Sequence, residues 1–217
     1  MRAWSLAVIA LLLGGCATAP QPAPVGNPAR AWRARVAELT PLRAWDVRGR
    51  MAVHTAHHGG EVSLRWVKKD QSYTIDLSGP LGHGLVRLQR SASGARLEDE
   101  HRHVYYAENA EELLFKTTGW RVPLRGLAYW IRGLPVPGVK HEQRLDDAGL
   151  LRGLRQMGWH IRFLAYKHYG RYVLPSDIEL TQVAPAQGNR TFDRSRLDRK
   201  FRPVDARLLI ERWAYLR

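Results

Sequence analysis

The sequence predicts a mainly β fold with some α structure: an incomplete antiparallel β-barrel in which short helices form a plug or lid. Two observations predict it. Apolar and polar residues alternate with a period of two between residues 45 and 88 and again after residue 159, which is typical of half-buried antiparallel strands. In the middle of the chain the apolar residues have helical spacing, and one short predicted helix precedes the first strand. A sheet this long must close or be capped, and the central helices can cover the opening.

The N-terminus carries an export signal that ends at a cysteine. Met1-Arg2 is positively charged, and the apolar run that follows is shorter than the roughly 20 residues that span a bilayer. Small residues then precede Cys16, in a pattern that resembles a bacterial lipobox. We expect residues 1–15 to be a signal peptide and Cys16 to be the lipid attachment site. The alternatives are an ordinary secretory signal or an uncleaved anchor with a stray cysteine.

Cys16 is the only cysteine in the chain, so lipidation leaves none for a disulfide, a thiolate nucleophile or a zinc–thiolate site. Ala17 follows it, whereas in Gram-negative bacteria an aspartate there retains lipoproteins at the inner membrane. We therefore expect a lipid anchor in the outer membrane, facing the periplasm. Residues 16–27 are rich in Pro and Ala and predict an extended tether. Residues 28–217 predict a single domain.

The first predicted helix begins after the tether. Asn27 is a suitable N-cap, and Pro28 suits the first helical position. Its apolar face comprises Trp32, Val36 and Leu39. The Thr-Pro pair at positions 40 and 41 ends this helix.

Four strands should follow as a meander. The alternating runs cover residues 45–53, 62–66, 73–77 and 86–88. Turn-forming residues separate them, at Gly59-Gly60, Lys69-Asp70 and Gly79-Pro80. The meander is therefore predicted to be apolar on one face and polar on the other.

The middle of the chain predicts two helices. Asn109, with Glu112 three residues later, predicts a helix start, and Gly119 predicts its end. Pro123 opens the second helix, which should end at Gly133. Strand patterning returns at residues 159–165, 178–183 and 207–215.

The chain has a formal net charge of +14. An exported protein meets little nucleic acid, so we expect no nucleic-acid partner; anionic lipid head groups or an acidic protein are the favoured partners. The alternative is a generally basic composition that serves solubility, since Arg is spread through every segment. The densest basic run lies between residues 190 and 207.

No catalytic motif is present: the sequence has no Gly-x-Ser-x-Gly, P-loop or His-Glu-x-x-His. His54, His57 and His58 lie near Glu61, but in or beside a Gly-Gly hairpin that should face water. We therefore expect no metal, no cofactor and no enzymatic activity.

Several short strings, taken in order, resemble the LolB family of outer-membrane lipoprotein receptors. They are Trp45-Asp46-Val47-Arg48-Gly49-Arg50, Leu64-Arg65-Trp66, Gly79-Pro80-Leu81-Gly82, the helix start at Ala110 to Leu114, Pro123-Leu124 with Leu127, Trp130-Ile131-Arg132-Gly133-Leu134-Pro135, Gln156-Met157-Gly158-Trp159, Leu174-Pro175 and Trp213. The resemblance spans nearly the whole mature chain. The stretch Asn189 to Pro203 departs from it, because it is longer and more basic than the family pattern.

The resemblance implies an incomplete barrel closed on one side by short helices around an apolar cavity. Such a protein accepts the acyl chains of a lipoprotein from the soluble periplasmic carrier LolA and inserts the lipoprotein into the inner leaflet of the outer membrane. The implied partners are thus LolA, client lipoproteins and that leaflet, and we expect a monomer. The residues expected to line the cavity are Leu64, Trp66, Ile75, Leu127, Trp130, Ile131, Trp159, Ile161 and Trp213. For each Trp, ordinary core packing is the alternative.

The resemblance also assigns a membrane-delivery loop to Pro80, Leu81 and Gly82, with Leu81 as its exposed leucine. Pro80 fixes φ and the flanking glycines allow a tight reversal, so Leu81 should project from the tip. Burial of this side chain in a membrane is worth about 2 kcal/mol. The alternative is a hairpin leucine folded onto the barrel rim.

Two other functions are compatible with an exported basic protein. A scaffold lipoprotein that binds lipopolysaccharide or cell-wall polymer would have no deep apolar cavity. A periplasmic hydrolase would have a polar cleft with paired acid–base residues. An apolar cavity as wide as an acyl chain, with its mouth near Leu81, would separate these functions from the first.

Overall fold

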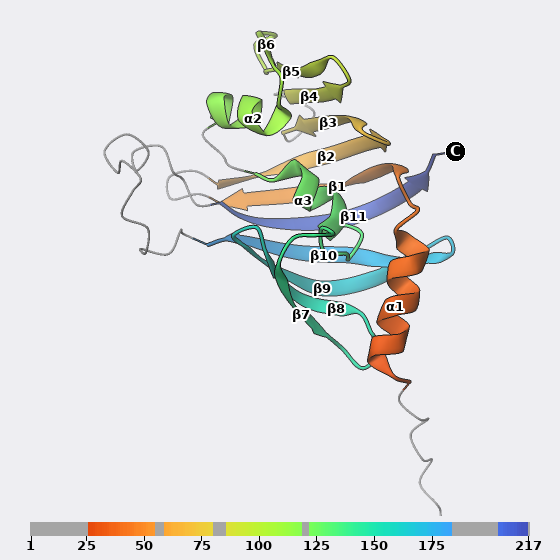
Figure 1. Ribbon diagram of the computed structural model, residues 1–217. Coiled ribbons are helices and arrows are strands. Elements are labelled where there is room, and N and C mark those ends of the chain that lie inside the picture. The colour runs from red at the N-terminus through yellow and green to blue at the C-terminus, as the bar shows by residue number, and fades with distance from the viewer. Residues whose placement is uncertain (1–25, 55–58, 80–85, 119–121, 184–203, 217) are drawn as a thin grey trace, which may run out of the picture.

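Eleven strands form one antiparallel sheet, in the order β6-β5-β4-β3-β2-β1-β11-β10-β9-β8-β7 (Figure 1). The structure is a computed structural model that describes residues 26–54, 59–79, 86–118, 122–183 and 204–216. The strands are β1 (Ala44–His54), β2 (Gly59–Lys69), β3 (Ser72–Ser78), β4 (Val86–Ser91), β5 (Gly94–Glu98), β6 (Val104–Ala107), β7 (His141–Leu145), β8 (Leu151–Gln156), β9 (Trp159–Tyr169), β10 (Tyr172–Gln182) and β11 (Asp205–Tyr215).

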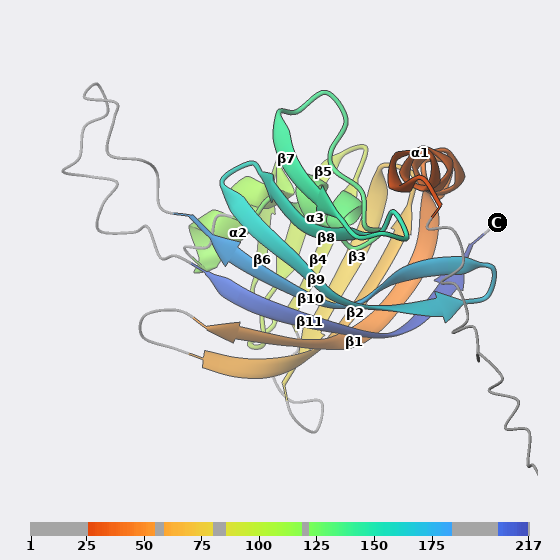
Figure 2. The same cartoon turned by 90° about the horizontal axis from the view of Figure 1, so that it is seen from below.

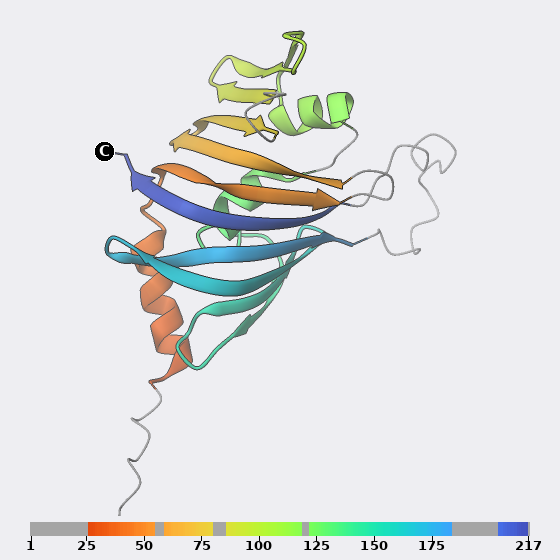
Figure 3. The same ribbon diagram turned by 180° about the vertical axis from the view of Figure 1, so that it is seen from behind.

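The sheet curves around its helices without closing. Its edge strands, β6 and β7, do not pair with each other. Two helices, α2 (Ala110–Thr118) and α3 (Leu124–Trp130), lie on the concave side, and α1 (Pro28–Leu39) crosses one end (Figure 2). Figure 3 shows the opposite, outer face of the strands. These observations confirm the predicted mainly β fold with short helices. None of the described helices has the length and apolarity needed to cross a bilayer.

Helix α1 starts where the sequence predicts. The side chain of Asn27 accepts hydrogen bonds from the backbone N–H groups of Ala29 (3.0 Å) and Arg30 (3.2 Å), so it satisfies two of the free N–H groups at the helix start. Further along, Arg35 donates to the carbonyl of Val173 on β10 at 2.6 Å. This long-range hydrogen bond fixes the helix across the end of the sheet.

The junction between β1 and β11 joins the two halves of the sheet and requires a glycine. The register of this pair shifts between Arg48 and Gly49. A Cβ atom at Gly49 would lie 2.1 Å from the carbonyl oxygen of Leu209. Any larger residue would therefore push the two strands apart at the irregularity that bends the sheet.

Three tryptophans from neighbouring strands pack together near the α1 end of the sheet. Trp45 has no exposed surface. Its ring meets those of Trp66 and Trp213 edge-on, with centroid distances of 5.1 Å and 5.4 Å. Such contacts contribute beyond the area that they bury. They join β1 and its neighbour β2 to β11, which is adjacent in the sheet but distant in sequence.

Four strands were not predicted: β5, β6, β7 and β8. The edge strands β6 and β7 expose nearly all their residues, so neither has the alternation that identifies a half-buried strand. Strands β5 and β8 have only five and six residues. Cys16, the Pro80–Gly82 loop, His57, His58 and the basic stretch at 189–203 lie outside the described residues.

We predict that Trp45→Ala lowers the free energy of unfolding by about 3–5 kcal/mol, because it removes the central ring of the cluster and leaves a cavity. Urea unfolding measures this change. Tyr106→Ala is the control, since Tyr106 is 75% exposed on an edge strand and its loss should cost less than about 0.5 kcal/mol. Equal effects of the two substitutions would show that the cluster does not hold the sheet together.

Candidate functional site: an apolar cavity under the helices

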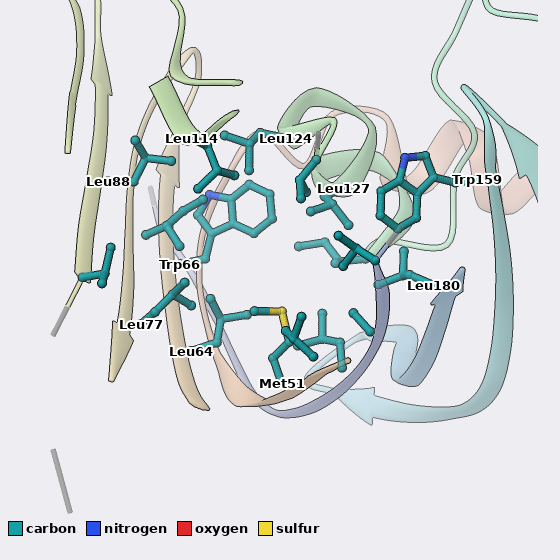
Figure 4. A pocket seen from close by; sticks show the side chains of 18 of the residues that line it. Met51, Leu64, Trp66, Leu77, Leu88, Leu114, Leu124, Leu127, Trp159 and Leu180 are labelled. Atoms are coloured by element: carbon teal, nitrogen blue, oxygen red, sulfur yellow. The ribbon is translucent and has the colours of Figure 1, made fainter. Parts of the chain in front are cut away.

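A cavity of about 100 Å³ lies between the concave face of the sheet and the helices. Figure 4 shows side chains from both halves of the sheet and from α2 and α3 pointing into it. Its lining residues are Met51, Val53, Leu64, Trp66, Ile75, Leu77, Val86, Leu88, Leu97, Leu114, Val122, Leu124, Leu127, Ile131, Trp159, Leu180, Val204, Ala206 and Leu208. All of them are apolar, so this wall has no charged side chain.

Six of the nine residues that the sequence analysis placed around a cavity lie in this wall. They are Leu64, Trp66, Ile75, Leu127, Ile131 and Trp159. Trp66 and Trp159 face the space from opposite sides (Figure 4). These residues come from β2, β3, β9 and the α3 region, so the fold brings together four separate parts of the sequence.

The other three residues are buried outside the wall. Trp130 is held in the core because its indole Nε1 donates to Gln156 Oε1 at 3.0 Å. Trp213 packs edge-on against Trp45. Ile161 is 1% exposed near the start of β9. Apolar patterning identifies an inward-facing residue, but it does not distinguish one that faces a cavity from one that meets another side chain.

Sequence reasoning missed other wall residues for two reasons. Met51, Leu77 and Val86 share the alternation phase of the predicted residues, so the pattern contained their signal. Leu97 lies on β5, which was not predicted. Val204 and Ala206 follow directly after the basic stretch, where no strand was expected before residue 207.

Buried polar groups fix the C-terminal end of α3. Besides holding Trp130, Gln156 accepts a hydrogen bond from the Val136 N–H at 2.8 Å and donates to the carbonyls of Val136 and Val139 at 3.0 and 3.2 Å. Removing this side chain would leave several buried groups unpaired, each at a cost of about 1–3 kcal/mol. The end of α3 is therefore rigidly attached to β8.

Arg132 makes a second attachment. Its Nε donates to the carbonyl of Ala128, and its Nη1 donates to the carbonyls of Leu39 and Leu42, at 2.9, 3.2 and 2.8 Å respectively. The guanidinium also stacks on the ring of Tyr129. Burial lowers the pKa of Arg132. These bonds tie α3 to the end of α1.

Helix α2 is held differently. Asn109 caps it by accepting from the N–H of Glu111 at 2.7 Å. The helix packs against β4, β5 and β6, at the edge of the sheet. A hydrogen bond links it to α3, from the N–H of Arg125 to Glu111 Oε1 at 3.1 Å. The part of the cavity roof that contains Leu114 thus rests on the edge half of the sheet.

The wall suits hydrocarbon rather than acid–base or metal chemistry. Within the described ranges, no three His, Cys, Asp or Glu side chains come close enough together to hold a metal ion, and His54 is exposed. An apolar cavity of this kind favours an apolar occupant, because water there would lack hydrogen-bond partners.

Comparison with known proteins agrees with this geometry. The family model described as "Outer membrane lipoprotein LolB" matches residues 43–213. An outer-membrane lipoprotein LolB from Pseudomonas putida is 36% identical over 155 residues, which cover 71% of this chain and 75% of the relative. One from Nitrosococcus oceani is 36% identical over 171 residues, covering 78% and 85%.

A solved structure of a DUF1329 family protein from Desulfovibrio piger has a TM-score of 0.51 at 7% identity, covering 87% of this chain and 93% of that one, and so shares the fold alone. The family match spans the sheet from the start of β1 to Trp213 on β11, including every strand that contributes to the cavity wall. The chain therefore belongs to the outer membrane lipoprotein LolB family.

Proposed function

We propose that this protein is a lipoprotein receptor anchored to the periplasmic face of the outer membrane through lipid on Cys16. It accepts lipoproteins from the carrier LolA, holds their acyl chains and inserts them into the inner leaflet of the outer membrane. The observation that carries the proposal is the wholly apolar wall beneath α2 and α3. Family membership supports the same function.

Acyl chains require such a site on thermodynamic grounds. Each buried CH₂ group is worth about 0.8 kcal/mol, so exposing one ordinary chain to water costs on the order of 10 kcal/mol. Release through water would be slow, and the chains should instead pass directly from the cavity of the carrier into this one. Delivery runs downhill if the bilayer binds the chains better still. No covalent step and no nucleotide are needed.

The cavity must widen to accept a chain. Its volume of about 100 Å³ is below the about 300–1,000 Å³ typical of ligand sites. Residues 109–134 were the expected lid, but α3 is fixed by Gln156 and Arg132. We therefore propose that α2 moves and that the Glu111–Arg125 hydrogen bond breaks as it does.

The proposed delivery loop connects two residues of the cavity wall. Leu77 and Val86 pair across β3 and β4, and both line the cavity. The chain between them contains Leu81. A leucine carried by this connection suits transfer of acyl chains from the cavity to a membrane.

The alternative of a scaffold for lipopolysaccharide or cell-wall polymer is not favoured, because it gives no role to an apolar cavity. A hydrolase would need acid–base side chains in the cavity wall, and the described wall residues include none.

We predict that Ala206→Phe lowers receipt of a labelled lipoprotein from LolA by about tenfold or more, because the larger ring occupies the cavity. Ala214→Phe is the matched control, since Ala214 is exposed on the same strand. Urea unfolding checks the expected overpacking cost of about 1–3 kcal/mol. Undiminished receipt by a folded Ala206→Phe protein would contradict acyl binding in this cavity.

We predict that Leu81→Glu leaves receipt from LolA intact but blocks transfer to liposomes, because a carboxylate resists burial in hydrocarbon. Leu216→Glu, at an exposed leucine, should affect neither step. Both steps are measured with one labelled lipoprotein, first in solution and then after adding liposomes. Loss of receipt in Leu81→Glu would instead identify Leu81 as a core residue.

A further inference from the structure

A second cleft, of about 880 Å³, lies beside the apolar cavity. It is bordered by the end of α1, the turn between β2 and β3, the start of α2, and α3. Trp66 and Leu124 line both spaces. A ligand with an apolar chain and a polar head could therefore occupy both, with its junction at these two residues.

The cleft carries an excess of positive charge. Its charged side chains are Arg43, Lys68, Arg90, Arg125 and Arg132, against Asp70, Glu108 and Glu111. In the described part of the chain, no ion pair joins any of these eight residues to a partner, although other arginines of the protein are paired with carboxylates. We call this space the cationic cleft.

Lys68 and Arg132 have the least favourable surroundings. Desolvation lowers the pKa of Lys68, the charges of Arg132 and Arg43 lower it further, and Asp70 opposes them. Arg132 is 6% exposed, and its guanidinium donates to the carbonyls of Leu39, Leu42 and Ala128 rather than to a carboxylate. Partly desolvated positive charge that exceeds the nearby negative charge is costly, so an anion in the cleft would relieve it.

A buried polar group without a partner lies at the boundary between the two spaces. The indole Nε1 of Trp66 is buried without a hydrogen-bond acceptor. An unpaired buried N–H costs about 1–3 kcal/mol, and such a group is uncommon enough to require a reason. An ester carbonyl at the junction of an acyl chain and its head group would be a suitable acceptor.

We propose that the cavity and the cationic cleft together bind a glycerophospholipid. One acyl chain occupies the cavity, its ester carbonyl accepts from Trp66 Nε1, and its phosphodiester lies against Lys68 and Arg43, with Arg132 behind them. This is a second class of ligand, and it rests on the proposed function only in that the cavity must admit an acyl chain. The diacylglyceryl group of a lipoprotein has ester carbonyls but no phosphate, so the cations select the phospholipid.

Such binding gives the cavity an occupant after delivery. When lipoprotein chains leave for the bilayer, an enlarged apolar cavity would face water. A membrane phospholipid that enters as they leave avoids this cost, and the next lipoprotein then displaces it. Receipt and delivery would both be exchanges of one acylated molecule for another.

Photocrosslinking in vesicles tests the proposal. The full-length lipidated protein is reconstituted into phosphatidylcholine vesicles that contain a trace of phosphatidylglycerol or of diacylglycerol, each with a photoreactive group in one acyl chain. Labelled peptides are identified by mass spectrometry. We expect cavity-wall peptides to be labelled about tenfold more by phosphatidylglycerol, as one charge-assisted contact would give.

Lys68→Gln should remove that preference, whereas Lys69→Gln should keep it. Lys69 is the matched control because it is the exposed neighbour of Lys68 on the same strand and does not line the cleft. Trp66→Phe keeps an aromatic side chain but removes the N–H, and should reduce labelling by both lipids. Inorganic phosphate should compete only weakly, because it has no acyl chain.

Equal labelling by the two lipids would overturn the proposal and leave the proposed function intact. So would equal effects of Lys68→Gln and Lys69→Gln, or strong competition by inorganic phosphate, which would indicate a free-phosphate site. If only an acidic peptide abolished the stronger labelling by phosphatidylglycerol, the cleft would be assigned to the peptide part of the cargo instead. No labelling of wall peptides by either lipid would contradict the proposed function itself.

Discussion

The structure depends on one constraint: the concave face of the sheet is apolar, but the sheet does not close. Strands β6 and β7 stay apart as edges, so an uncovered interior would expose the apolar side chains to water. The helices meet this constraint. Helix α1 crosses one end, and α2 and α3 lie over the concave face (Figure 2). They cover the face without filling it, and the remaining space is the cavity.

The two covering helices are attached through different contacts. Helix α3 is tied to β8 by Gln156 and to α1 by Arg132, through buried hydrogen bonds. Helix α2 rests on the edge strands and meets α3 through the Glu111–Arg125 bond. The proposed movement of α2 would open the cavity without disturbing the tryptophan cluster around Trp45.

Local sequence patterns predicted the features that depend on neighbouring residues, such as strand alternation and helix caps. Period-two alternation identified the inward phase of Leu64, Trp66 and Ile75, and Asn27 identified the start of α1. The edge strands lack alternation because both of their faces meet water. Whether Trp130 or Trp213 faces a cavity depends on Gln156 and Trp45, which are distant in sequence. The cationic cleft joins residues from five regions of the chain, so no motif could reveal it.

The central claim is that the acyl chains of cargo occupy the cavity beside Trp66 and Trp159. Bromine atoms quench indole fluorescence only at short range, so a lipoprotein with brominated acyl chains tests this directly. The account predicts that receipt of this cargo quenches the fluorescence of the wild-type protein, and that the quenching is largely lost when both residues are changed to Phe. Receipt without quenching, or quenching unchanged in the double variant, would place the chains elsewhere and contradict the account.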